Sequence, residues 1–238
     1  MLAEPMMAGI HVADPETLSL QATFPRFVEI ERRYGSLTRG MIAARRAAHA
    51  NGRDARTTTF MTLRGGLQEL VGALAHAIRA EIRLGTRVTR LAATPAGGYR
   101  LLLDDSVMLE ADAVVLATPA YVSADLLRHT APELATKLDA IRYVSTATVS
   151  LGYNADEFEH PLDGFGFVVP RHEQARLLAC TWTSTKFPQR AAPGTVLLRA
   201  FVGGPRREGL VALDDDALVG LVREELRGLP LAPQQPAV

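Results

Sequence analysis

The most distinctive residues of this sequence are glycines that flank an aromatic side chain in a strand-like run, Gly164-Phe165-Gly166-Phe167-Val168-Val169-Pro170. Glycine weakens a strand unless another group must approach the backbone closely. The run therefore favours a slot for a flat apolar ligand, with a bulge at a sheet corner as the structural alternative. Two other segments, Thr181-Trp182-Thr183 and Arg199 to Gly204, could supply further walls of such a slot.

Residue patterns for other kinds of chemistry are absent from the sequence. It contains no GxGxxG after a strand, no P-loop, no CxxC and no HExxH. The six histidines are scattered, so we expect no metal site. The one cysteine, Cys180, lies in an apolar run, which predicts a buried, unreactive thiol. A single cysteine also excludes an internal disulfide and fits a reducing cytosol.

Composition excludes several classes of protein. The chain has 238 residues, 47% of them hydrophobic, which is enough for one large domain or two small ones. Its formal net charge is zero, so we expect no nucleic-acid partner. The basic residues are almost all arginine, which reflects genome composition or serves carboxylate binding. We find no signal peptide, and no apolar run approaches the roughly 20 residues of a spanning helix, so we expect a cytoplasmic protein.

The elements that must position these residues fall into a helical part and a β-rich part. The Asp14-Pro15-Glu16 start signal and the later breaks predict helices within 14–50. Gly65-Gly66 opens a helix whose apolar residues follow the spacing of one buried face. We predict further helices and strands in the order strands 87–91, 99–103, 107–110 and 113–117, helices 120–128 and 132–140, strands 144–153, 165–169, 177–183 and 195–202, and a helix over 214–227.

The strand predicted over 113–117 carries a second signal. Its continuous apolar run is typical of a strand buried on both faces, and it ends at Thr118-Pro119. A strand, a hairpin and then such a strand recur in two-dinucleotide-binding flavoproteins. There, small residues let the backbone approach a flat cofactor, and the proline fixes the exit angle.

Seven blocks of residues together carry a family resemblance. They are Leu18-Ser19-Leu20 with Phe24-Pro25, Tyr34-Gly35-Ser36-Leu37, Gly65-Gly66-Leu67-Gln68-Glu69-Leu70, Ala117-Thr118-Pro119-Ala120, Gly164-Phe165-Gly166, Thr181-Trp182-Thr183-Ser184 with Lys186-Phe187-Pro188, and Phe201-Val202-Gly203-Gly204. In this order and spacing the chain resembles the oxygen-dependent protoporphyrinogen oxidases, and more closely the bacterial branch that oxidises coproporphyrinogen.

The resemblance implies an α/β (α+β) fold, part of a two-dinucleotide-binding flavoprotein with a mixed-sheet substrate domain and a helical subdomain. Residues 1–60 would belong to the helical, membrane-facing subdomain, 61–125 to the FAD-binding domain and 126–238 to the substrate domain. The implied partners are FAD, a porphyrinogen substrate, molecular oxygen and, through peripheral contact, a membrane. Hydride loss to a flavin needs placement more than acid–base groups, so no catalytic residue is expected here.

Ten site residues follow from the same resemblance, position by position. Those expected to line the macrocycle pocket are Gly9, Phe165, Gly166, Val168, Thr181 and Phe201. Those expected near FAD are Val88, at the adenine, and the turn Ala117, Thr118 and Pro119. Thr181 departs from the branched apolar residue that is usual in the family. Arg171 and Arg199 are candidates for the rim of the pocket, where carboxylates would lie.

The segments that the resemblance implies and the sequence lacks are equally informative. The N-terminal phosphate-binding glycine motif, the arginine downstream of it that pairs with a propionate, and the C-terminal glycine-rich flavin segment are not found. We therefore expect a middle fragment that binds no flavin and is inactive alone. Two alternatives stay open: a fragment of a flavin amine oxidase or carotene desaturase, and a non-catalytic tetrapyrrole-binding module.

Overall fold

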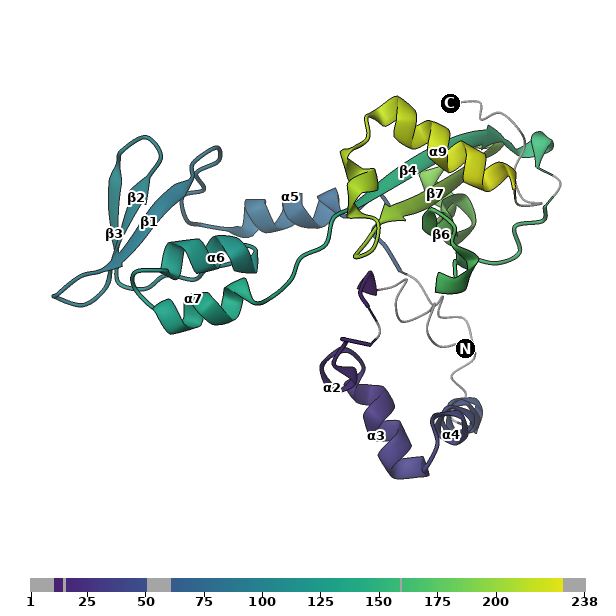
Figure 1. Ribbon diagram of the computed structural model, residues 1–238, viewed down its shortest axis with the longest axis horizontal. Coiled ribbons are helices and arrows are strands. Elements are labelled where there is room, and N and C mark those ends of the chain that lie inside the picture. Colours follow the sequence, from purple (N-terminus) through teal and green to yellow (C-terminus); the bar gives the residue numbers. More distant parts are fainter. Residues whose placement is uncertain (1–10, 15, 51–60, 159, 229–238) are drawn as a thin grey trace. The chain divides into compact units, whose positions relative to one another are not determined.

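The structure, a computed structural model, describes residues 11–14, 16–158 and 160–228 except 51–60 (Figure 1). The chain divides into two compact units, of which the first comprises residues 1–69 and 144–238 and the second Leu70–Tyr143. The assignment of 1–60, 61–125 and 126–238 to domains of a complete enzyme stays a prediction.

The first unit begins with three helices, α2 (Leu20–Thr23), α3 (Pro25–Tyr34) and α4 (Leu37–Ala50). Pro25 stands at the first position of α3, where its missing N–H costs nothing. The predicted start at Asp14 is wrong, because Asp14 closes a turn by accepting from the Glu16 and Thr17 amides. The cap is instead Ser19, whose hydroxyl accepts from the Ala22 amide.

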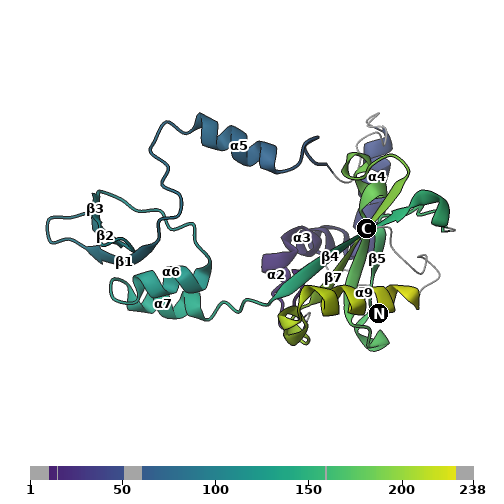
Figure 2. The ribbon, with the colours of Figure 1, turned by 90° about the horizontal axis from the view of Figure 1, so that it is seen from above.

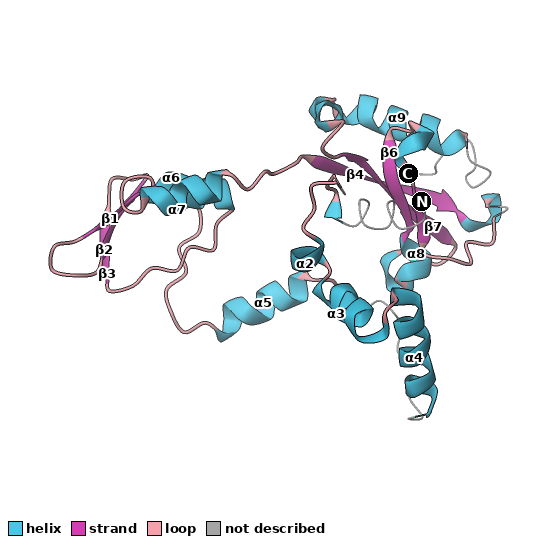
Figure 3. Cartoon of the chain, turned by 60° about the horizontal axis from the view of Figure 1, so that its bottom comes forward, coloured by secondary structure: helices cyan, strands magenta, loops and turns pink. Residues whose placement is uncertain are grey.

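Four strands of the first unit form one sheet in the order β4-β7-β6-β5 (Figure 3). They are β4 (Thr146–Asn154), β5 (Gly166–Val168), β6 (Leu177–Trp182) and β7 (Thr195–Gly203). Every pair is antiparallel, so the part of the predicted mixed sheet that these strands supply is antiparallel. The link between β5 and β6, residues 169–176, is shorter than the crossover of a dozen or more residues that a parallel pair needs, so these two strands can only run antiparallel.

Helix α9 (Asp215–Arg227) covers one face of this sheet (Figures 1 and 3). The Asp214 carboxylate caps it by accepting from the Ala217 amide at 2.8 Å. Four of its apolar side chains, Leu218, Leu221, Val222 and Leu226, are buried in one cluster with the sheet. Short helical turns occupy the links: η1 (Ala155–Glu157), η2 (Arg171–Glu173), α8 (Thr183–Lys186), η3 (Pro188–Arg190) and η4 (Glu208–Ala212).

The second unit combines an antiparallel sheet with a helix pair. The sheet is β1 (Val88–Ala93), β2 (Tyr99–Leu103) and β3 (Met108–Ala111), as predicted. Figures 1 and 2 show α6 (Ala120–Leu127) and α7 (Pro132–Asp139) side by side. The Thr130 hydroxyl donates to the Leu91 carbonyl at 2.9 Å and joins this pair to β1.

Two predictions for this part of the chain are wrong. Residues 113–117 pair with no strand in the described part of the chain, and Val115 is 92% exposed. Helix α5 (Gln68–Ala77) forms as predicted, but it buries no residue, and Leu74 is 55% exposed. Both failures have the same cause. An apolar segment is buried only where another helix or strand packs against it, and the described residues provide no such packing partner for either segment.

Candidate functional site

The four-stranded sheet has two chemically different faces. Alternate residues of each strand pack under α9, among them Val149, Leu198 and Cys180. We call the other side, which is turned away from α9, the distal face. Its residues are Thr148, Ser150, Gly166, Val168, Ala179, Thr181, Arg199 and Phe201, as the strand register shows.

Cross-strand pairing arranges the distal face in two adjacent rows. One row runs Thr148, Phe201, Ala179, Val168 across β4, β7, β6 and β5. The next runs Ser150, Arg199, Thr181, Gly166 across the same strands. Side chains directly opposite one another in such a row lie about 5 Å apart. The rows therefore form a continuous surface of small and apolar groups with one cation.

Four of the residues predicted for the macrocycle pocket share this face. They are Gly166, Val168, Thr181 and Phe201, which come from three different strands. Phe165 precedes β5 and is 49% exposed, and its carbonyl accepts from the Trp182 amide at 3.0 Å. Gly9 lies outside the described residues, and so does the side chain of Arg171.

Sequence reasoning missed three neighbours on the same face and misplaced one. Thr148, Ser150 and Ala179 complete the rows, and the alternation of β4 was the available signal. Phe167, which belongs to the run Gly164 to Pro170 considered as a ligand slot, stands opposite Cys180 and packs against the core cluster instead. Successive residues of a strand point to opposite faces, so Gly166 and Phe167 cannot share one.

Gly166 is glycine for a structural reason. Its φ is +133°, and a Cβ there would run into the Cys180 carbonyl oxygen and lie 2.8 Å from the Thr181 Cα. The close approach that the sequence suggested is therefore that of β6 backbone. A valine at this position would disturb the pairing of β5 with β6 rather than merely fill a slot.

Arg199 is the charged group of the distal face. It is exposed, and its Nε donates to the Ser150 hydroxyl at 3.3 Å. No aspartate or glutamate of the described residues pairs with it. Within the described part of the chain, the guanidinium is therefore available to a carboxylate of a ligand.

Cys180 lies on the opposite face of the same sheet and is 1% exposed. Burial raises the pKa of its thiol to about 12, and the Arg199 backbone opposes this only in part. The thiol is thus neutral at physiological pH, which excludes it as a nucleophile. The structure confirms the predicted burial of Cys180, and its lack of reactivity stays a prediction.

The four residues predicted near FAD lie in the second unit. Val88 opens β1 opposite Leu103. Thr118 and Pro119 close the start of α6, because Ser123 bonds to the Thr118 hydroxyl at 2.7 Å and its amide donates to the Pro119 carbonyl. Ala117 is exposed in the unpaired segment before them. The turn is thus held by hydrogen bonds, and its residues Ala117, Thr118 and Pro119 are exposed.

The described residues contain no evident cradle for the phosphates of a dinucleotide. The glycine pair Gly65-Gly66 before α5 has the right composition. However, the Gly65 amide donates to the Glu69 carboxylate at 2.6 Å, and this negative charge would repel a phosphate. The described residues therefore offer no site for the phosphates of FAD, and the roles of Val88, Ala117, Thr118 and Pro119 near FAD stay predictions.

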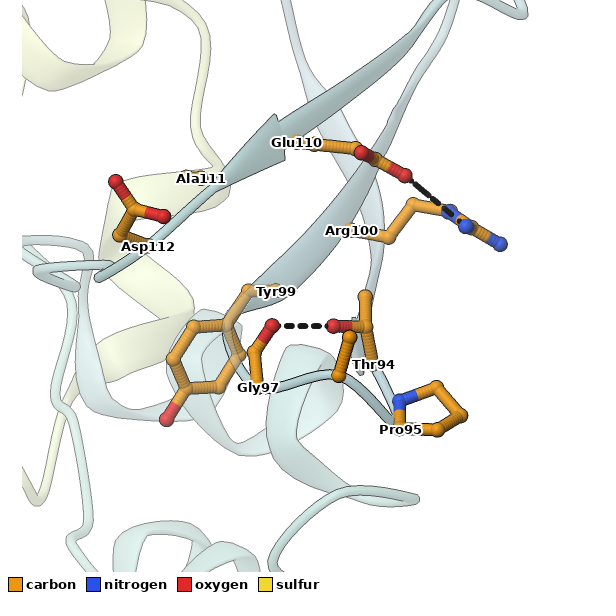
Figure 4. Close-up of a pocket in the computed structure, with 9 residues that line it drawn as sticks. Thr94, Pro95, Gly97, Tyr99, Arg100, Glu110, Ala111 and Asp112 are labelled. Atoms are coloured by element: carbon orange, nitrogen blue, oxygen red, sulfur yellow. Dashed lines mark hydrogen bonds and ion pairs between the residues drawn. The ribbon is translucent and has the colours of Figure 1, made fainter.

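A cavity of about 390 Å³ lies at the tip of the β1–β2 hairpin (Figure 4). Its walls are polar and include an ion pair between Arg100 and Glu110 at 3.0 Å. It contains none of the predicted site residues. We do not assign it a ligand.

Two further observations concern metals and membranes. No group of three histidine, cysteine, aspartate or glutamate side chains in the described ranges is placed to hold a metal ion. None of the helices formed by those residues is long and apolar enough to cross a membrane.

With this geometry, the comparison with known families is direct. The family described as flavin containing amine oxidoreductase matches residues 1–237, and the chain belongs to it. Among curated relatives, coproporphyrinogen III oxidase of Bacillus subtilis (strain 168) is 35% identical over 95% of this chain. Protoporphyrinogen oxidase 1 of Arabidopsis thaliana chloroplasts is 29% identical over 98% of it.

The solved structures agree with this placement. A crystal structure from Exiguobacterium sp. 255-15, provisionally named a protoporphyrinogen oxidase, superposes with a TM-score of 0.76 at 34% identity over 98% of this chain. Putrescine oxidase superposes with a TM-score of 0.57 at 16% identity, which shows likeness of fold alone. The chain spans about half the length of the curated relatives it matches, 48% and 46% for the two named above.

Proposed function

We propose that this chain supplies the substrate-facing sheet and part of the flavin domain of an FAD-dependent porphyrinogen oxidase of haem biosynthesis. The observation that carries the proposal is the distal face, where Val168, Thr181 and Phe201 from three strands meet in adjacent rows. The two curated relatives described above are named as a coproporphyrinogen III oxidase and a protoporphyrinogen oxidase, which favours this reading over an amine oxidase.

The reaction in the complete enzyme is a six-electron oxidation. FAD would supply the hydride-accepting chemistry in the complete enzyme, with molecular oxygen as the final electron acceptor. Three such rounds convert one porphyrinogen and three O₂ into one porphyrin and three H₂O₂. The residues of the distal face have one task in this scheme, which is to hold the flat ring in a fixed orientation.

The surroundings of this reaction are also part of the proposal. We place the complete enzyme in the cytoplasm, with its helical part in peripheral contact with a membrane. Exposed apolar side chains on α4, such as Met41 at 58% and Ile42 at 48%, support that contact.

A chimera tests this proposal. Residues 1–237 would replace the matched half of the Bacillus subtilis relative, and the isolated chain would serve as the control. We expect the isolated chain to be colourless and inactive, and the chimera to be yellow and to produce fluorescent coproporphyrin from coproporphyrinogen. A chimera that binds flavin and oxidises putrescine, but no porphyrinogen, would contradict the proposal.

A further inference from the structure

Arg199 occupies an unusual place for a cation. It stands in the middle of the distal face, between Ser150 on β4 and Thr181 on β6, with Phe201 and Leu197 as its neighbours two residues away on the same strand. Residues i and i+2 of a strand share a face, so its side chain rises from a partly apolar surface.

Its bonding leaves most of the guanidinium available. Among the described residues, its side chain donates one hydrogen bond to another side chain, from Nε to the Ser150 hydroxyl, which is a neutral acceptor. Two other arginines of the first unit are held differently, since Arg176 pairs with Glu224 and Glu225 and Arg190 donates to Thr62 and the Leu63 carbonyl. Arg199 thus combines fixation through Ser150 with an uncompensated charge.

We propose that Arg199 binds a carboxylate of the macrocycle and thereby fixes the rotation of the ring on the distal face. The inference rests on the proposed function, because it assumes that the ligand is a porphyrinogen. Such a ring is flat and apolar, with carboxylates on its rim. In this arrangement Phe201, Val168 and Ala179 contact the ring. The guanidinium donates two hydrogen bonds to the two oxygens of one carboxylate on the rim of the macrocycle.

Binding measurements on the full chain test this inference. The ligands are coproporphyrin III, which carries carboxylates, and its neutral tetraamide, and the readout is quenching of fluorescence from Trp182, the single tryptophan. For the wild-type chain we expect tighter binding of the acid than of the amide. Arg199→Ala should weaken binding of the acid about tenfold and leave the amide unchanged.

Two further variants separate charge from structure. Arg199→Lys keeps the charge without the fork and should recover part of the affinity. Arg90→Ala removes an exposed strand arginine of the second unit and should leave both affinities unchanged. Circular dichroism of each variant checks that the chain is folded.

The outcomes distinguish this inference from the function on which it rests. Equal affinity of wild type and Arg199→Ala for the acid would overturn the role of Arg199 and leave the proposed function standing. Equal weakening of acid and amide by Arg199→Ala would also overturn it, because the loss would not concern a carboxylate. If neither porphyrin quenched wild-type Trp182 saturably, the substrate-binding face itself would be refuted.

Discussion

At the residue scale, Gly166 determines whether β5 can pair with β6. A Cβ there would run into backbone of β6, and φ of +133° is rarely adopted by other residues. We therefore expect Gly166→Ala to lower the free energy of unfolding by about 2 kcal/mol or more. Urea denaturation followed by Trp182 fluorescence measures the change.

Gly220→Ala is the matched control for this prediction. Gly220 lies on the exposed side of α9, and nothing stands within 4 Å of an added Cβ. Because alanine is the better helix former, this variant should gain up to about 1 kcal/mol. If Gly166→Ala were as stable as wild type, the backbone of β5 could not lie as close to the backbone of β6 as the structure shows.

The burial of Cys180 leads to a second prediction at the residue scale, on how the free energy of unfolding depends on pH. An unfolded thiol titrates near 9.0, whereas burial raises the pKa of Cys180 to about 12. Between these values the unfolded chain has released the proton and the folded chain has kept it. Stability is therefore unaffected by this group below pH 9 and falls by up to about 1.4 kcal/mol per pH unit above it.

Unfolding of wild type and Cys180→Ala at several pH values checks this sign. The alkaline loss should be smaller in the variant, because only the wild type has this thiol to ionise. In parallel, a thiol reagent at pH 8 should label Cys180 only after denaturation. Rapid labelling of the native chain would contradict the burial on which the prediction depends.

At the element scale, one arginine fastens α9 to the sheet. Arg176 precedes β6, and its Nε bonds to the Glu225 carboxylate at 2.7 Å while its backbone amide donates to the same group at 3.1 Å. Glu224 also bonds to this arginine, but its side chain is 68% exposed against 17% for Glu225. The Arg176–Glu225 pair should therefore contribute more to stability than the Arg176–Glu224 pair, because water screens the more exposed pair.

We accordingly predict different costs for the two neighbouring glutamates. Glu225→Gln should lower the free energy of unfolding by about 1–2 kcal/mol, since it weakens charge-assisted bonds. Glu224→Gln should change it by less than about 0.5 kcal/mol. Thermal or urea unfolding ranks the variants, and equal effects would mean that α9 is not docked through Arg176.

The element scale also shows what local pattern can and cannot predict. The three strands β1 to β3 and helices α6, α7 and α9 form where propensity, caps and alternation place them. Residues 113–117 and the apolar side of α5 carry equally strong patterns, yet stay exposed. Pattern specifies which face is apolar, while burial depends on partners that the described residues do not include.

At the scale of the whole molecule, the candidate site depends on strand register rather than on any motif. The sequence indicates Val168, Thr181 and Phe201 through family resemblance, but not that Ser150 and Arg199 stand in the next row. That neighbourhood follows from the strand order β4-β7-β6-β5, in which β7 pairs with the earlier strand β4. Pairing between distant segments cannot be derived from local periodicity.

Thr181→Phe in the chimera with the Bacillus subtilis relative tests most directly whether the macrocycle lies on the distal face. Thr181 is half-buried between Gly166 and Arg199, so an aromatic ring there would occupy the surface. We predict full flavin content with a Michaelis constant for coproporphyrinogen raised about tenfold or more, whereas Thr136→Phe on α7 should match the unmodified chimera. Unchanged kinetics in a flavin-loaded Thr181→Phe chimera would contradict the account.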